Sequence, residues 1–199
     1  IDRLLSIDDP ASRSELRHWA ERYYCSRAYT NHLHRWHARL ARQLGETDVL
    51  PILLLRALSF DHRLRSLPEQ ALAHADQAAV LARRHHPGDL RLAVQVASER
   101  GAALAGAGRL AESRDELRLA LAGLAQRQPI AHSPLMRIHY QLAAMSLSLG
   151  ELDEAVAAAQ ASINHAMQSD DPADAAEARV AKSLLALARL NRGDDGAAG

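Results

Sequence analysis

Three histidines close together in the sequence, His32, His34 and His37, are the residues whose type and spacing first raise metal chemistry. Neutral imidazole is a common zinc ligand, and residues three or four apart share one face of a helix. Only His34 and His37 meet that spacing, no cysteine or carboxylate stands at ligand spacing, and no HExxH motif is present. We therefore predict no metal site and interpret these side chains as a solvated helix face.

No catalytic constellation is found in the sequence. Cys25 is the only cysteine, and a lone cysteine is more often a small buried apolar group than a nucleophile. The chain has no Gly-rich phosphate-binding loop and no Ser, His and Asp spacing that supports a catalytic triad. His85 and His86 end a predicted helix, where they suit the helix dipole. We predict that the protein is not an enzyme and uses no cofactor.

Composition narrows the class of protein. The 199 residues are 48% apolar but only 4% aromatic, which favours closely packed helices rich in Ala and Leu. A formal net charge of zero gives no bulk argument for binding to nucleic acid or to a membrane surface. The single cysteine fits a reducing cytoplasm, and the sequence has neither a stretch of about 20 apolar residues nor a signal-peptide pattern. Because the chain opens at Ile1 without Met, we expect it to be a piece of a longer protein.

Charge is distributed unevenly along the chain. Residues 1–66 carry a net +3, residues 67–149 a net +2 and residues 150–199 a net −5. One interpretation is the bias of an Arg- and Ala-rich genome, since Lys182 is the only lysine. The other is an array with a basic first end and an acidic last end, which favours head-to-tail contact or an oriented partner.

Apolar residues recur at intervals of three and four throughout, and no convincing alternating run is present, so the elements that position any site are helices. We predict helices over residues 11–25, 27–44, 49–64, 68–85, 89–107, 111–127, 134–149, 152–168 and 173–192. At the breaks, Asp89 is expected to cap the next helix and Pro134 to occupy a first helical position. The glycines within helix pairs suit left-handed helix C-termini.

One short phrase occurs twice, as Gly108-Arg-Leu-Ala-Glu-Ser113 and as Gly150-Glu-Leu-Asp-Glu-Ala155. Gly193 follows Gly150 at nearly the same interval, and an eroded copy, Arg65-Ser-Leu-Pro-Glu-Gln70, precedes Gly108 at that interval. A fixed period of about 42–43 residues with helical filling predicts a solenoid of helix pairs. We therefore expect an all-α, right-handed superhelical solenoid of antiparallel helix pairs with about nine helices.

The segment around the second copy resembles a tetratricopeptide repeat. In that family the first helix carries a small residue and ends at a glycine; here Ala143 and Gly150 match these positions. An apolar residue follows two positions after the glycine and a small residue opens the second helix; Leu152 and Ala155 match these. The preceding unit fits through Gly101, Leu104, Gly108, Leu110, Ser113 and Ala120. Two features depart from the family: its Trp and Tyr positions are mostly Ala, Leu or Ser here, and the period is longer than about 34 residues.

The resemblance covers about residues 50–193 and predicts three parts. Residues 1–49 form an N-terminal helical cap, residues 50–172 about three helix pairs, and residues 173–199 a C-terminal capping helix with a flexible tail. The long period is similar to the extended repeats of bacterial signalling and transcription regulators. Such arrays bind peptides or proteins, or sense a ligand for an attached output domain.

The resemblance also implies where a partner would bind, because first helices line the concave groove of such arrays. Projection from Gly101 and Ala143 gives groove-facing candidates of which the polar ones are Gln95, Ser98, Arg137, Tyr140 and Ser183. Arg137 and Tyr140 are the best anchors, since Arg and Tyr contribute strongly to binding when buried at interfaces. The alternative is that Tyr140 packs in the core and Arg137 is solvated.

Most of the aromatic residues lie in the N-terminal region, including Trp19, Tyr23, Tyr29 and Trp36. They form either a bulky cap over the first repeat or a homodimer interface, since exposed aromatic side chains mark association. Arginines interleaved with aromatics could also bind nucleic acid, but nearby glutamates dilute the patch and no reading motif is present. We expect no direct contact with nucleic acid or membrane.

These observations favour a non-enzymatic scaffold that binds a protein or peptide, as a regulatory or sensory module of a larger bacterial protein. Two alternatives stay open. The chain is a self-association module for an attached output domain, or it is a sensor that binds a small molecule in the groove.

Overall fold

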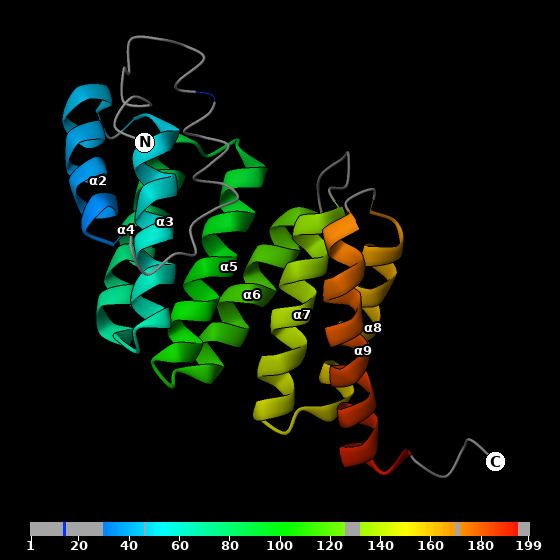
Figure 1. Ribbon diagram of the computed structural model, residues 1–199. Coiled ribbons are helices and arrows are strands. Elements are labelled where there is room, and N and C mark those ends of the chain that lie inside the picture. Colours follow the sequence, from blue (N-terminus) through cyan, green and yellow to red (C-terminus); the bar gives the residue numbers. More distant parts are fainter. Residues whose placement is uncertain (1–13, 15–29, 46, 126–131, 170–171, 195–199) are drawn as a thin grey trace. The chain divides into compact units, whose positions relative to one another are not determined.

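The computed structural model describes residue 14 and residues 30–45, 47–125, 132–169 and 172–194 (Figure 1). Every regular element in these residues is an α-helix, which confirms the predicted all-α class. The helices are α2 (Thr30–Leu44), α3 (Val49–Leu64), α4 (Pro68–His85), α5 (Leu90–Gly106), α6 (Leu110–Ala125), α7 (His132–Ser148), α8 (Leu152–Met167) and α9 (Pro172–Arg192). None of these helices combines the length and the apolar character that a membrane crossing requires.

The helix bounds agree with the predicted ones to within three residues. The helix predicted over residues 11–25 lies outside the described residues apart from Ser14. Asp89 caps α5 as expected, because its Oδ1 accepts a hydrogen bond of 2.9 Å from the backbone N–H of Leu92. The position predicted for Pro134 is wrong, since α7 begins at His132 and the proline is its third residue. Proline is tolerated there because the first N–H groups of a helix have no intrahelical acceptor.

The turns inside the helix pairs share one geometry. Gly108 and Gly150 adopt positive φ angles of 76° and 78°, and Ser66 adopts the same left-handed region at 58°. In each turn the next residue's N–H bonds back to a carbonyl five residues earlier: Leu67 to His62 at 2.9 Å, Arg109 to Leu104 at 2.9 Å, and Glu151 to Ser146 at 2.8 Å. This bond, together with a left-handed residue, is the Schellman pattern that ends a helix. The predicted left-handed glycines are therefore confirmed.

The eroded first copy of the repeat is displaced by one residue from the register that the sequence match predicts. The match aligns Arg65 with Gly108, but the structure places Ser66 at the left-handed position equivalent to Gly108. In this register Ala71, Ser113 and Ala155 are equivalent, and all three are buried, at 0%, 1% and 1% exposure. The left-handed residues of the three turns, Ser66, Gly108 and Gly150, are therefore evenly spaced along the chain.

Two compact units divide the chain, residues 1–92 and residues 93–199, and each is described by itself. In the first unit α3 contacts α2 and α4. One side of α2 supplies Leu33, Trp36 and Leu40 to a core that they share with Leu50, Leu54, Ala57 and Leu58 of α3. This apolar stripe at intervals of three and four fixes which side of α2 faces α3.

In the second unit α7 contacts α6, α8 and α9, and α8 also contacts α9. Small residues also permit close approach of α5 and α6. A Cβ atom at Gly101 would lie 3.0 Å from the Cδ2 of Leu117, closer than ordinary contact, and the Ser113 hydroxyl donates a 2.7 Å hydrogen bond to the Gly101 carbonyl. In the next repeat the positions equivalent to Gly101 and Leu117 are Ala143 and Ala159, both buried in the core of this unit.

Candidate functional site

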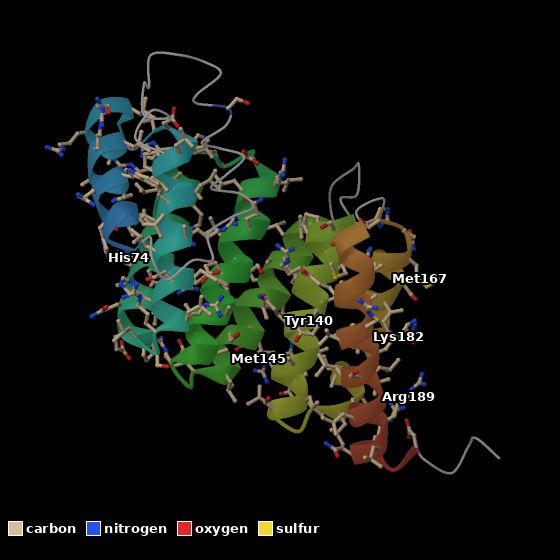
Figure 2. The ribbon with its side chains drawn as sticks, in the orientation of Figure 1. His74, Tyr140, Met145, Met167, Lys182 and Arg189 are labelled. Atoms are coloured by element: carbon tan, nitrogen blue, oxygen red, sulfur yellow. The ribbon has the colours of Figure 1, made fainter. Side chains whose placement is uncertain are left out.

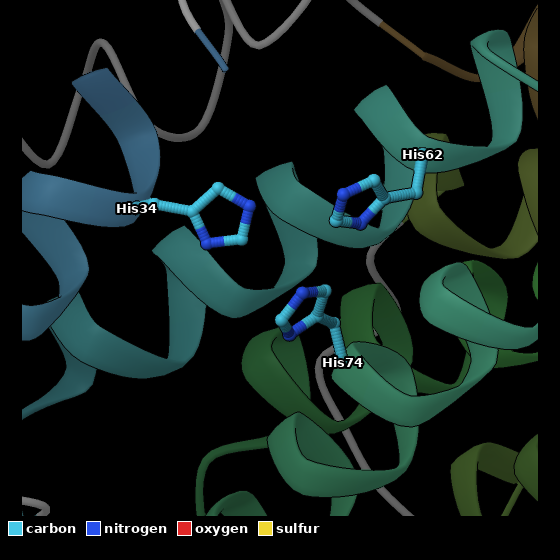
Figure 3. Close-up of side chains that lie close together, drawn as sticks. All are labelled: His34, His62 and His74. Atoms are coloured by element: carbon cyan, nitrogen blue, oxygen red, sulfur yellow. The ribbon is translucent and has the colours of Figure 1, made fainter. Parts of the chain in front are cut away.

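Three imidazole rings from three different helices meet in the first unit. His34 lies on α2, His62 on α3 and His74 on α4, and one ring nitrogen of each lies within 4.8 Å of the others. The ring centroids of His62 and His74 are 5.0 Å apart with nearly parallel planes, and His34 lies 5.5 Å and 5.6 Å from the two (Figure 3). We call this group the three-histidine cluster.

Local structure explains how the three residues come together. His62 is in the last turn of α3 and His74 is in the second turn of α4, so the tight turn at Ser66 folds one toward the other. His34 follows Leu33 on α2, and the burial of Leu33 and Trp36 against α3 sets the orientation of this helix. The side chain of His34 is exposed and that of His74 is half-buried. His62 is buried, with 6% of its surface exposed.

Burial controls the protonation of the cluster. Desolvation is the largest cause that lowers the pKa of His74 to about 4, and the neighbouring rings of His62 and His34 lower it further. Desolvation followed by the proximity of His34 also lowers the pKa of His62, although Asp61 opposes the shift. Both rings are therefore neutral near pH 7, and each keeps a nitrogen lone pair. The Nδ1 atom of His62 is buried without a hydrogen-bond partner among the described residues.

Of the histidines on α2 whose side chains the structure describes, His34 belongs to the cluster. The side chain of His32 lies outside the described residues, whereas His37 is half-buried on α2 and lies close enough to His74 to lower its pKa. Helical spacing within one segment could not find His62 and His74, since they lie on two other helices. Their positions near the facing ends of the helices predicted over residues 49–64 and 68–85 were a signal that they lie close together.

A second group of histidines lies in the second unit. His132 and His139 are two turns apart on α7, and His165 is on α8. The Nδ1 atoms of His132 and His165 are 3.1 Å apart, and the rings of His139 and His165 stack with centroids 5.4 Å apart. Desolvation by burial, followed by His165, lowers the pKa of His139 to about 4, and its Nδ1 has no hydrogen-bond partner among the described residues.

This burial predicts a loss of stability in mild acid. The folded-state pKa of His139 is about 4 and its ordinary value is 6.5, so below pH 6.5 the unfolded chain binds a proton that the folded chain does not. We expect the contribution of His139 to be complete above pH 6.5 and to fall by about 1–2 kcal/mol as the pH decreases to 4, with allowance for its partial exposure. Urea unfolding between pH 7 and pH 5 measures this. A His139→Gln variant should unfold with a weaker dependence on pH, and equal dependences would contradict the assignment.

The candidate partner-binding residues lie on α5, α7 and α9 in the second unit. Ser98 is buried and donates a 3.1 Å hydrogen bond to the Oε1 of Gln141, and Gln95 is half-buried one turn before it. Arg137 is partly exposed and forms an ion pair of 3.4 Å with Glu177. Ser183 is exposed on α9. Tyr140 is half-buried and packs against the core of the second unit (Figure 2).

The aromatic residues of the N-terminal region fall into two groups. Trp36 is 5% exposed and packs in the core of the first unit with Leu33 and Leu40. Its side chain is therefore part of the contact between α2 and α3 and is not exposed for an interface. Trp19, Tyr23 and Tyr29 lie outside the described residues, as does Cys25. The dimer-interface role stays a prediction for these three aromatic residues.

No protein-family model matches the chain, and no curated protein matches it.

Proposed function

We propose that this chain is a non-enzymatic, tetratricopeptide-like helical scaffold, a right-handed solenoid of helix pairs, that binds a protein or peptide along its first helices. In this proposal it serves as a regulatory or sensory module of a larger bacterial signalling protein. The support comes from contacts between residues about one repeat apart in the second unit.

Successive first helices are joined at intervals close to the repeat length. Ser98 on α5 bonds Gln141 on α7, which is 43 residues later. Arg137 on α7 pairs with Glu177 on α9, which is 40 residues later. Helices one repeat apart must lie side by side for such contacts, as stacked helix pairs require. This adjacency of α5, α7 and α9 is the observation that carries the proposal.

Second helices are joined in the same way. Arg118 on α6 forms ion pairs of 2.7 Å with Glu154 and 3.3 Å with Glu151 of the next repeat, and Arg114 also pairs with Glu151. The carboxylate of Glu154 in turn accepts a hydrogen bond from Ser146. Because the bonds extend over several side chains, they fix the register between repeats better than one exposed ion pair would.

In this proposal the partner segment binds across the exposed sides of α9 and α7. Val180 and Leu187 on α9 are 49% and 45% exposed, with Ser183 between them on the same side of the helix. On α7 the corresponding side holds half-buried Ala144 and Leu147. Exposed apolar side chains beside small ones favour an apolar or amphipathic partner segment, since burial of such surface drives association.

A charge placed in this surface tests the proposal. We expect Leu187→Glu to abolish retention of a partner, because a carboxylate would have to be buried at the interface. The matched control is Ala186→Glu, which puts the same charge on the adjacent exposed position of α9. Immobilised wild type and both variants, shown to be equally helical by circular dichroism, are exposed to a lysate of the source organism. A specific partner retained by wild type and A186E but not by L187E supports the proposal.

Two outcomes contradict it. Equal retention by L187E and A186E would mean that the partner binds elsewhere. Retention of nothing except further copies of the chain would favour the self-association module.

A further inference from the structure

We propose that His34, His62 and His74 bind one divalent transition-metal ion, of which Zn²⁺ is the type, and that this ion ties α2 to the hairpin of α3 and α4. The site is independent of the proposed peptide-binding surface, which belongs to the second unit.

The positions of the donor atoms come close to those of a metal site. A ring nitrogen of each histidine lies within 4.8 Å of the other two. Nitrogens that share a tetrahedral zinc ion with bonds of about 2.0–2.1 Å stand about 3.3 Å apart. Binding of one ion would require rotation of the side chains to close this difference, and the exposed His34 is the ligand with the fewest neighbours to displace. Figure 3 shows the three rings turned toward a common space between their helices.

The donor set selects the class of metal. All three ligands are imidazoles, which suit Zn²⁺, Cu²⁺ and Ni²⁺, whereas Mg²⁺ and Ca²⁺ require oxygen ligands. The nearest carboxylate in sequence to His62 is Asp61, which is occupied by an ion pair of 2.9 Å with Arg65. Three protein nitrogens leave a fourth position of a tetrahedral ion open to water.

The protonation state and the burial of the ligands also favour an ion. His62 and His74 have lowered pKa values, so neither has to release a proton before it binds metal near pH 7. The buried Nδ1 of His62 lacks a hydrogen-bond partner among the described residues, and a buried polar atom without a partner destabilises the fold. Coordination by one nitrogen fixes the ring orientation and leaves the other to a neighbouring acceptor.

The three ligands come from three helices, which gives the ion a structural effect. The ion would bond α2 directly to α4 as well as to α3. Because the ligands assemble in the folded chain and not in the unfolded one, bound metal stabilises the fold by mass action. We expect saturating zinc to raise the melting temperature by about 5 °C.

Calorimetric titration with Zn²⁺ tests the site. The full chain, treated with chelator and then freed of it, is titrated with ZnCl₂ at pH 7 as wild type and as H34A, H74Q and H86Q. His34 is exposed, so H34A should fold, and His86 lies outside both histidine groups and serves as the control. We expect one site per chain, with affinity lowered about 100-fold or more by H34A and H74Q and unchanged by H86Q.

A spectroscopic readout identifies the ligands separately from stability. Co²⁺ in place of Zn²⁺ should give the visible absorption of a tetrahedral nitrogen site in wild type and H86Q but not in H34A. The proposal is overturned if wild type gives no saturable binding, if H34A and H74Q bind as tightly as wild type, or if His139→Gln rather than H34A removes the site.

Discussion

Replacement of Ala143 by tryptophan should lower the free energy of unfolding by about 3 kcal/mol, the upper end of the cost of overpacking a core. Ala143 is 1% exposed within the core of the second unit. At the equivalent position Gly101, a single added Cβ atom would already lie 3.0 Å from Leu117. An indole ring at Ala143 would therefore force α7 and α8 apart.

Urea unfolding followed by far-UV circular dichroism measures this effect. Ala157→Trp is the matched control, because Ala157 is exposed on α8 and a tryptophan there displaces no neighbour. We expect the control to change stability by less than about 0.5 kcal/mol. Equal midpoints for the two variants would show that Ala143 does not occupy a close contact between helices.

Replacement of Gly150 by valine should lower the free energy of unfolding by about 2 kcal/mol, through backbone strain rather than crowding by neighbours. Gly150 has a φ of +78°, and an added Cβ would meet no atom within 4 Å. A β-branched residue in the left-handed region is strained by its own backbone. The strain falls on the turn that ends α7, where the N–H of Glu151 bonds the carbonyl of Ser146.

Gly88→Val separates backbone strain from the general effect of adding a side chain. Gly88 also has open space around its Cβ position, but its φ is not positive. We expect thermal unfolding to show a lower melting temperature for the Gly150 variant and little change for the Gly88 variant. A similar decrease in melting temperature for both variants would mean that the left-handed conformation of Gly150 does not cause the loss of stability.

The first repeat shows why sequence matching set the register one residue off. The match aligns Leu67 with Leu110, because both precede a glutamate by two residues. In the folded chain the turn is defined by the left-handed residue and by the bond that Leu67 donates to His62, so Ser66 is the equivalent of Gly108. Because this position is a serine, an alignment of the repeats on their glycines does not find it. Only the backbone conformation restores the even spacing of the three turns.

Short-range patterns in the chain were enough to predict the helices of the described residues, with ends correct to within three residues. Apolar residues at intervals of three and four, the cap at Asp89 and the glycines at 108 and 150 act within a few residues of the chain, and the structure agrees with them. Such interactions are encoded locally, so they can be predicted from neighbouring residues.

Which side chains meet depended instead on how the helices pack. His34 lies with His62 and His74 only because the packing of α2 on α3 and the turn at Ser66 set three helix faces toward one point. The pairing of Arg137 with Glu177 likewise depends on the adjacency of α7 and α9. Helical periodicity shows which face of each helix is apolar but not which other helix covers it, because that choice depends on the fit of side chains far apart in sequence.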